Sequence, residues 1–370
     1  MLHRRLVRLY RSRGMPFVPR PLAPSRLPAA AENAYLKLFR GGVADMRPWP
    51  SEVVDEAPHC RVSRYEMHPG EEPVQRTPVL LVPPLAAPPS CFDLYRGNSL
   101  AEQLTALGYL TYFVDYGRIG FDDRELGLEY WINTVIPRAC GVTLTDSGAD
   151  RVHLVSWSLG GIMSLLGVAD GRIEAASVTM VGSPFDFTQV RMMAPVRLLA
   201  GLTGGRIVTA LYRALGGAPE PLVRWGFQAT AIQRELTKPL FLAQNLDNRE
   251  LLAHAEAVDA YMRNVIAYPG RSFGQLYHRF FLVNEIYGGR VELSNRTVDL
   301  KNVRAPVLAI AGTSDVLAPL AAVNHVARLL PPAVEVELKT APGGHLGVLA
   351  GRAAERTTWR YIDEFLLAND

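Results

Sequence analysis

Cysteine, long apolar stretches and net charge are all scarce in this chain of 370 residues. The cysteines, Cys60, Cys91 and Cys140, are far apart and odd in number, so the sequence predicts neither a disulfide framework nor a metal site. Reduced thiols in a cytoplasmic protein are the simplest interpretation. No uncharged apolar run reaches the roughly eighteen residues of a membrane-spanning helix. The net charge of +3 is too small to indicate a nucleic-acid partner.

The composition is that of a globular protein, with 48% hydrophobic and 20% charged residues, and the chain is long enough to bury a large core. Positive charge is concentrated at the start, in a Pro-rich segment without the apolar core of a secretory signal. A basic arm is the simpler prediction, and a helix lying on an anionic membrane or granule surface is the alternative. The arginines concerned are Arg4, Arg5, Arg8, Arg11, Arg13 and Arg20.

Short apolar runs of strand length alternate with helical patterns along most of the chain. This alternation predicts a mostly parallel sheet with helices on both faces. One predicted helix, 130–140, is interrupted at Pro137, and two extended pieces near Val53 and 62–65 predict edge strands. The predicted sheet strands are 78–83, 110–115, 152–157, 177–182, 306–312 and 334–339.

The alternation stops after Pro184 and resumes near residue 298. In between, the pattern is helical, with an apolar stripe at Ile207, Leu211 and Leu215, which predicts a helical cap inserted into the sheet's connectivity. The predicted domains are an N-terminal extension with basic arm and edge strands (1–75), the first part of an α/β core (76–187), the cap (188–297) and the second part of the core (298–370).

The chain's central motif surrounds Ser158, between a predicted strand ending at Trp157 and a nearly all-apolar helix. Strand, sharp turn and helix around a serine form the nucleophile elbow of α/β hydrolases, G-x-S-x-G. Gly160 and Gly161 allow the helix to approach the strand closely, whereas Ser156 replaces the first glycine of the motif. We therefore predict an α/β-hydrolase fold with Ser158 as the nucleophile.

A serine hydroxyl needs a base, and the base needs an acid that orients it. Asp315 and His345 follow two later predicted strands, in the order that α/β hydrolases use, and therefore lie at the same carboxyl edge of the sheet as Ser158. Asp186 is a competing acid. The other histidines considered are expected to be structural: His153, His254, His278 and His325.

The negative charge that develops on the substrate oxygen needs two backbone donors. The N–H of Leu159, directly after the nucleophile, is one. The second is expected from the loop after the first strand, where Pro83 and Pro84 have no N–H and Leu85 is the first donor, with Ala86 next. Cys91 follows this loop but lacks an elbow, so it is not expected to be the nucleophile. This chemistry requires no metal or organic cofactor.

Several stretches between residues 75 and 350 resemble the polyhydroxyalkanoate synthases, most closely the short class that works with a second subunit. They are 79–84, 98–100, 114–117, 123–124, 158–161, 183–187, 298–307, Asp315 and 343–345. The resemblance implies an α/β-hydrolase core with a mobile cap, acyl transfer from hydroxyacyl-coenzyme A, and Ser158, Asp315 and His345 as nucleophile, acid and base. It also raises the prospect of a second subunit or a homodimer.

Two residues depart from that family. The synthases carry Cys where this chain has Ser158, and the residue after the catalytic Asp is commonly His where this chain has Val316. An ester on serine is more stable than a thioester on cysteine, and its release calls on water or an alcohol activated by His345. We therefore expect an acyl hydrolase or acyltransferase acting on ester or thioester substrates. The alternatives are a polymerising synthase and a non-catalytic partner at a granule or membrane surface.

Overall fold

The computed structural model describes residues 24–370 except 75–76, 230–237, 240 and 295, and the Arg-rich segment 1–20 lies outside these residues. Within the described residues, no helix combines the length and apolar character needed to cross a membrane. The chain divides into two compact units. The smaller is Met1–Ala44 with Gln233–Glu256, and the larger is Asp45–Ile232 with Ala257–Asp370.

The smaller unit contains helix α2 (Leu27–Phe39) and helix α11 (Arg249–Arg263) up to Glu256. Glu256 pairs with Lys37 and accepts the backbone N–H of Val43 at 2.7 Å. The side chain of Asn33 donates to the Leu246 carbonyl at 2.8 Å. Polar contacts between distant parts of the chain therefore hold this unit together.

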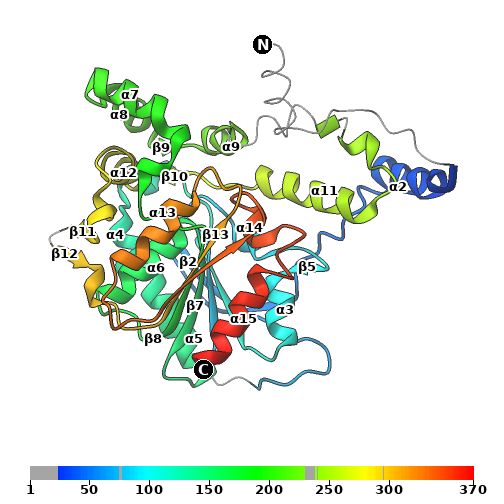
Figure 1. The fold of residues 1–370 in the computed structure, drawn as a ribbon, viewed down its shortest axis with the longest axis horizontal. Helices are drawn as coiled ribbons and strands as arrows, with labels where there is room; N and C mark the ends of the chain where they lie inside the picture. The colour runs from blue at the N-terminus through cyan, green and yellow to red at the C-terminus, as the bar shows by residue number, and fades with distance from the viewer. Residues whose placement is uncertain (1–23, 75–76, 230–237, 240, 295) are drawn as a thin grey trace, which may run out of the picture. The chain divides into compact units, whose positions relative to one another are not determined.

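The larger unit is built on a sheet of eight strands in the order β1-β2-β6-β3-β7-β8-β13-β14. All neighbours from β6 to β14 run parallel, whereas β2 is antiparallel to both β1 and β6. The six parallel strands coincide with the predicted ones, and β7 lies in the middle (Figure 1). The strands are β1 (Ser51–Ala57), β2 (Cys60–Tyr65), β3 (Val79–Val82), β6 (Thr111–Asp115), β7 (Val152–Trp157), β8 (Ala175–Val181), β13 (Val307–Gly312) and β14 (Val336–Ala341).

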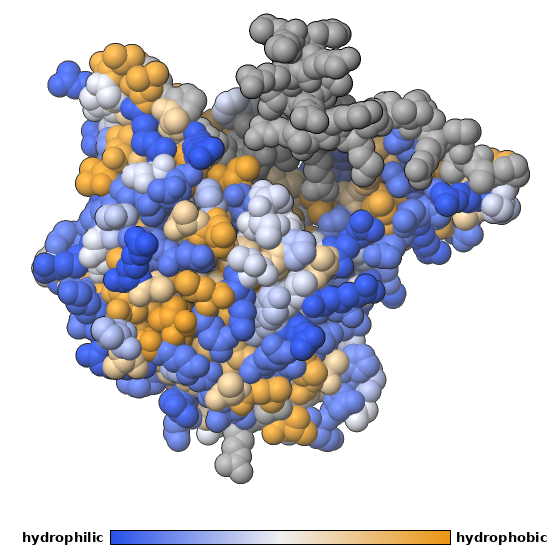
Figure 2. Space-filling view, viewed as in Figure 1, coloured by the Kyte–Doolittle hydropathy of each residue, from blue (hydrophilic) through white to orange (hydrophobic). Residues whose placement is uncertain are grey.

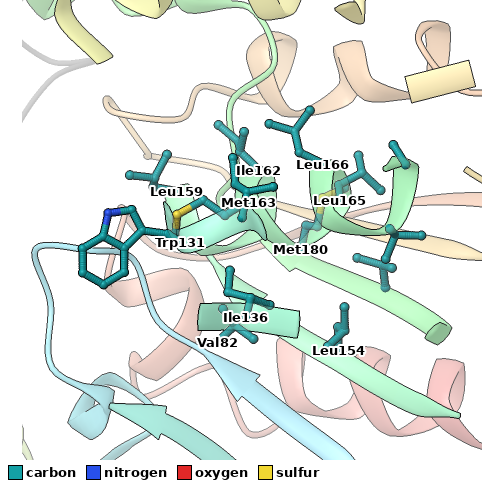
Figure 3. Packing of buried hydrophobic residues seen from close by; sticks show 14 of the residues in the cluster. Val82, Trp131, Ile136, Leu154, Leu159, Ile162, Met163, Leu165, Leu166 and Met180 are labelled. Atoms are coloured by element: carbon teal, nitrogen blue, oxygen red, sulfur yellow. The ribbon is translucent and has the colours of Figure 1, made fainter. Parts of the chain in front are cut away.

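Helices cover both faces of this sheet. Helices α5 (Ile136–Ser147) and α6 (Leu159–Ala169) pack on one face, and α3 (Leu100–Ala106) and α15 (Thr358–Ala368) pack on the other. Every residue of α6 is buried, and its side chains meet those of β3, β7 and β8 in the main core (Figure 3). This arrangement, together with the parallel strands, is the expected α/β-hydrolase fold.

The predicted interruption at Pro137 is wrong. The chain is helical from α4 (Leu128–Tyr130) through a π-helical turn, Trp131–Val135, into α5. Proline lies in the first turn of α5, where the widened π-helical turn ends. A first-turn position does not require the N–H that proline lacks, so the helix continues.

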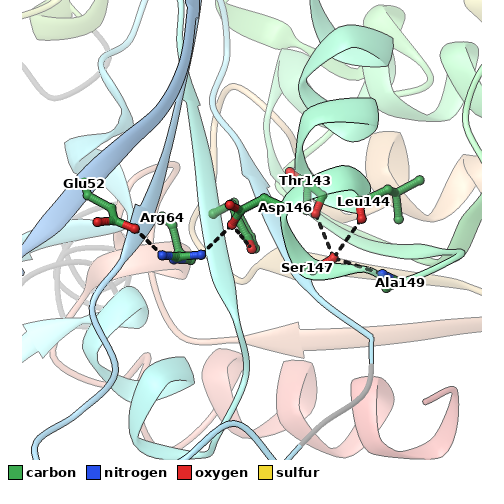
Figure 4. Close-up of polar contacts among 8 residues, drawn as sticks. Glu52, Arg64, Thr143, Leu144, Asp146, Ser147 and Ala149 are labelled. Atoms are coloured by element: carbon green, nitrogen blue, oxygen red, sulfur yellow. Dashed lines mark hydrogen bonds and ion pairs between the residues drawn. The ribbon is translucent and has the colours of Figure 1, made fainter.

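The antiparallel pair β1–β2 extends the sheet, so that β1 and not β2 is the edge strand. Arg64 on β2 pairs with Glu52 on β1 and, at 2.6 Å, with Asp146 on α5, as Figure 4 shows. At the end of the same helix, the Ser147 hydroxyl donates to the Thr143 carbonyl at 2.7 Å. Strands β1 and β2 are thus attached to helix α5.

The described residues between 188 and 297 are mainly helical, and they also contain short strands. The pair β11 (Arg290–Leu293) and β12 (Arg296–Asp299) forms an antiparallel hairpin that the sequence pattern did not indicate. Alternation of buried and exposed residues over four positions is too brief to detect against a helical background. The remaining elements are α7 (Ala194–Thr203), α8 (Arg206–Leu215), β9 (Gly217–Ala218), α9 (Glu220–Ala229), β10 (Tyr268–Pro269) and α12 (Gly270–Gln275), and near the end of the core α13 (Leu320–Asn324) and α14 (Gly347–Ala350). A two-residue strand β5 (Asn98–Ser99) and β4 (Asp93–Tyr95) form a separate pair.

Candidate active site

Ser158 occupies the sharp turn between β7 and α6 in a conformation that L-residues rarely adopt, with φ 55° and ψ −124°. Its N–H donates to the Val181 carbonyl at 2.8 Å, and its own carbonyl accepts the Ser183 hydroxyl at 2.7 Å. These bonds to and beyond the end of β8 hold the strained turn, which is the geometry of a nucleophile elbow.

The glycines after Ser158 are required by space. A Cβ on Gly160 would lie 2.5 Å from the Val82 carbonyl oxygen, and one on Gly161 would lie 2.2 Å from the Ser183 hydroxyl. Ser156 is fully buried, and its hydroxyl is satisfied by a hydrogen bond to that of Ser164 at 2.9 Å. The serine that replaces the first glycine of the motif therefore links β7 to α6.

The structure brings Ser158, His345 and Asp315 together although they are distant in the chain. Nε2 of His345 is 2.8 Å from Oγ of Ser158, and Nδ1 is 2.8 Å from Oδ2 of Asp315. The Asp315 side chain is fully buried, and that of His345 is 12% exposed. An alcohol, an imidazole and a carboxylate are thus in one hydrogen-bonded line that can transfer a proton.

The carboxylate is prepared to remain charged. Burial alone would raise the pKa of Asp315, but the adjacent His345 and the backbone N–H groups of Ala318 and Leu317 outweigh it and lower the pKa below 3.8. Those two N–H groups donate to Oδ1 at 2.9 and 2.8 Å, which leaves Oδ2 for the imidazole. An ionised acid in this position stabilises a protonated His345.

The loop that carries His345 is held from two sides. The indole N–H of Trp157 donates to the His345 carbonyl at 3.0 Å, and the two rings are 5.2 Å apart. Gly343 has φ 134°, and a Cβ there would lie 2.5 Å from the Gly347 carbonyl carbon. Only glycine fits this turn, which points the imidazole at Ser158.

Asp186, the competing acid, has other partners. It accepts hydrogen bonds from the N–H and hydroxyl of Thr188 and from the side chains of Gln189 and Asn284, at 2.6–3.1 Å. Burial would raise the pKa of Asp186, but these donors outweigh it and hold the pKa below its usual value. The carboxylate stabilises the turn after β8, whereas His345 bonds to Asp315.

The other candidate histidines of the larger unit, His153, His278 and His325, have structural contacts of their own. His153 hydrogen-bonds to Ser177 at 2.8 Å within the sheet, and burial lowers its pKa to about 4. His278 hydrogen-bonds to the Thr209 hydroxyl at 2.8 Å, and His325 to the Tyr287 carbonyl at 2.9 Å. His254 lies in the smaller unit.

The two backbone donors expected for the oxyanion lie on adjoining segments. Leu159 is the first residue of α6, and Leu85 is fully buried in the loop that follows β3. This loop is anchored, because the Pro83 carbonyl accepts the Tyr116 hydroxyl at 3.0 Å and the Ala86 carbonyl accepts the Ile266 N–H at 2.9 Å. Contact of the loop with Gly160 places it against the start of α6.

All three cysteines are free and buried. Burial raises the pKa of the Cys91 thiol well above its usual value. A thiol that resists ionisation is a poor nucleophile. Cys91 therefore does not compete with Ser158.

Sequence patterns alone did not identify the residues that position this line. Trp157 adjoins the serine, but nothing in the sequence indicates its bond to the His345 loop. Gly182 has φ 61°, and a Cβ there would approach the Asp315 carboxylate and the His345 ring at 3.4 and 3.5 Å. Its location at the end of a predicted strand was the available hint.

Comparison with known proteins finds similar sequences among polymerase subunits. The chain is 27% identical over 312 residues to the poly(3-hydroxyalkanoate) polymerase subunit PhaC of Allochromatium vinosum, covering 84% of this chain and 86% of that protein. It is 26% identical over 337 residues to the corresponding subunit of Thiocystis violacea, covering 90% and 92%. No protein-family model matches the chain.

Among solved structures, the fold matches a putative non-heme bromoperoxidase, BpoC, from Mycobacterium tuberculosis, with a TM-score of 0.51, 14% identity, and 85% of this chain and 100% of that chain covered. It also matches a monoacylglycerol lipase from Paleococcus ferrophilus, with a TM-score of 0.51, 16% identity, and coverage of 84% and 99%. The α/β-hydrolase fold and the similarity to the synthases are confirmed, and together they support an enzyme of acyl transfer or hydrolysis.

Proposed function

We propose that this polyhydroxyalkanoate-synthase-like chain is a serine-dependent acyl hydrolase or acyltransferase that forms a covalent acyl-enzyme on Ser158. The observation that carries the proposal is the hydrogen-bonded line from Ser158 through His345 to Asp315, with 2.8 Å at each step. His345 acts as the base and Asp315 as the acid that orients it.

The reaction follows from these positions. As Oγ of Ser158 attacks the acyl carbonyl carbon, its proton moves to Nε2 of His345, and the carbonyl electron pair moves to the oxygen. The N–H groups of Leu159 and Leu85 stabilise this oxyanion. The tetrahedral intermediate then expels the alcohol or thiol, which takes the proton from His345, and leaves an ester on Ser158. Water or an acceptor alcohol, deprotonated by His345, releases the acyl group in the reverse sequence.

The substrate class is proposed from the relatives' names and from the nucleophile. Poly(3-hydroxyalkanoate) polymerases indicate hydroxyacyl groups, with acyl-coenzyme A or an acyl ester as the donor. Transfer from a thioester to a serine gives a more stable oxygen ester. We therefore expect water or a small alcohol, rather than the hydroxyl end of a growing polymer, to be the acceptor. A second subunit or a homodimer remains part of this proposal.

Covalent labelling tests the proposed nucleophile. A fluorophosphonate probe should modify the parent protein at Ser158, and peptide mass spectrometry should locate the adduct there. The Ser158→Ala variant should not be labelled. An unlabelled parent that behaves like the variant toward p-nitrophenyl esters of graded length would contradict the proposal and favour a non-catalytic role.

Polymer synthesis is the second candidate function, favoured by the relatives. With 3-hydroxyacyl-coenzyme A, the parent is expected to release free hydroxyacid and coenzyme A, whereas a synthase would produce polymer and coenzyme A. The Ser158→Cys variant restores the synthases' nucleophile at that position and should shift products toward longer chains if the remaining site supports polymerisation. Polymer from the parent itself would establish the alternative.

A further inference from the structure

The helices α7 and α8 carry large apolar side chains on their outer surface. Leu198 and Leu202 on α7 are 69% and 78% exposed, and Ile207, Leu211 and Leu215 on α8 are 55%, 51% and 46% exposed. A spacing of four places the members of each set along one face of their helix. Figure 2 shows apolar side chains gathered over this pair of helices, which we call the α7–α8 hairpin.

These side chains are additional to the hairpin's own packing. The hairpin is attached through Ala200 and Tyr212, which cluster with Tyr277 from the π-helical turn after α12. Val196 and Val208 pack against the same cluster. The exposed leucines therefore belong to a second face, and an exposed apolar patch of this kind indicates a binding surface.

The same segment is purely basic. Between Phe187 and Pro219 the charged residues are all arginines: Arg191, Arg197, Arg206 and Arg213. Seven residues make almost two helical turns, so Arg206 and Arg213 lie along one line of α8, beside the apolar line. Among the described residues, no carboxylate forms an ion pair with either of them.

A pocket of about 410 Å³ adjoins α8 on the side of Arg213. Its other three arginines are already paired with carboxylates: Arg124 with Glu125, Arg271 with Glu129 and Arg279 with Glu285. Its lining arginines are Arg124, Arg213, Arg271 and Arg279, and its acidic lining residue is Glu125. Burial lowers the pKa of His278, which also lines the pocket, so this ring adds no positive charge at neutral pH. Guanidinium groups bind phosphate oxygens with two parallel hydrogen bonds. Among the described residues, Arg213 is the lining arginine that no carboxylate pairs with, so it is the group placed to contact a phosphate.

We propose that the α7–α8 hairpin docks on an anionic phospholipid surface, with its leucines and isoleucine among the acyl chains and with Arg206 and Arg213 at the headgroup phosphates. Apolar side chains bordered by arginines are the composition of helices that lie in a membrane interface. A second copy of the chain is the competing occupant, and light scattering separates it from a lipid surface. The proposal goes beyond the acyl chemistry and does not depend on Ser158.

Flotation with vesicles tests the docking, using the full chain. Vesicles of phosphatidylcholine and phosphatidylglycerol in equal parts should retain the parent, and vesicles of phosphatidylcholine alone should retain much less. Leu202→Ser with Leu211→Ser should lower the partition coefficient at least about tenfold. Arg206→Gln with Arg213→Gln should reduce the preference for phosphatidylglycerol and its sensitivity to salt.

Leu367→Ser is the matched control, since Leu367 on α15 is 51% exposed, as Leu211 is, and lies outside the hairpin. Thermal melting monitored by circular dichroism establishes that each variant is folded. If the leucine variant floats as well as the parent, binding occurs elsewhere and the proposal is overturned. A parent protein that does not float with the vesicles also overturns it. If light scattering shows that the parent is a dimer and the leucine variant a monomer, the surface is instead an interface with a second copy of the chain.

Discussion

At the scale of single residues, the choice between two acids is the clearest result. Asp186 and Asp315 both follow strands of the sheet, and the sequence left both open. In the structure the Asp186 carboxylate accepts hydrogen bonds from Thr188, Gln189 and Asn284. One oxygen of Asp315 accepts two backbone N–H groups, and the other is hydrogen-bonded to His345. The partners of each carboxylate, not its place in the chain, distinguish them.

We predict that Asp315→Asn slows fluorophosphonate labelling of Ser158 roughly a thousandfold or more, because an amide does not hold the required tautomer of His345 or stabilise its positive charge. Asp186→Asn is the control and should change labelling little. The rates are measured at pH 7 by mass spectrometry. A large loss in the Asp186 variant with little loss in the Asp315 variant would reverse the assignment.

The same residue predicts a pH effect on stability. The folded pKa of Asp315 is below its ordinary value of 3.8, so its ionised form favours the folded state. This contribution is complete above pH 3.8 and is lost as the pH falls through the lower folded value. Urea unfolding of the parent and Asp315→Asn should therefore show a stability difference at pH 7 that narrows below pH 4. A difference that widens on acidification would be inconsistent with the lowered pKa.

At the scale of elements, the site depends on how closely α6 approaches the loop after β3. Gly160 lies against the Val82 and Pro83 carbonyls, and the Ser156–Ser164 hydrogen bond ties the helix to the strand that delivers Ser158. Because Gly160 faces backbone carbonyls, a side chain added there could not be accommodated by a side-chain rotation of its neighbours.

We predict that Gly160→Ala destabilises the fold by about 1–3 kcal/mol and slows labelling of Ser158, since the new Cβ would lie 2.5 and 2.8 Å from two carbonyl oxygens. Gly141→Ala on α5 is the matched control, because nothing lies within 4 Å of its Cβ. That change should be neutral or stabilise by up to about 1 kcal/mol. Urea unfolding measures both, and equal effects would show that the close approach is not the cause.

At the scale of the whole molecule, one sheet carries the candidate catalytic groups at its carboxyl edge and buried polar groups in its interior. His153 on β7 is fully buried, and burial lowers its pKa to about 4. It is therefore neutral when folded and binds a proton more readily when the chain unfolds. Between its ordinary pKa of 6.5 and its folded value, stability should fall as the pH falls.

We predict that protonation of this histidine in the unfolded chain lowers the free energy of unfolding by about 2 kcal/mol as the pH falls from 7 to about 4.5. The contribution is measured as the difference in the pH dependence of urea unfolding between the parent and His153→Gln, in which residue 153 no longer titrates. The two stability curves should converge on acidification. Parallel curves over this range would mean that His153 does not change its charge on unfolding.

Periodicity and chain order by themselves determined the six parallel strands, their helices, the elbow around Ser158 and the edge on which Asp315 and His345 lie. They could do so because a strand's apolar run and a helix's repeat are local, and parallel strands place their carboxyl ends together. The continuation of the helix through Pro137 and the β11–β12 hairpin were not predicted, because a π-helical turn and a four-residue strand leave almost no pattern.

Only the tertiary structure decided which acid meets the imidazole, how Ser156 fits in place of glycine, and where the arginines around α8 gather. These outcomes depend on distances of a few ångströms between segments far apart in the chain, such as Trp157 and the His345 loop. Packing sets those distances, and it involves many residues at once, whereas each sequence pattern involves only neighbours.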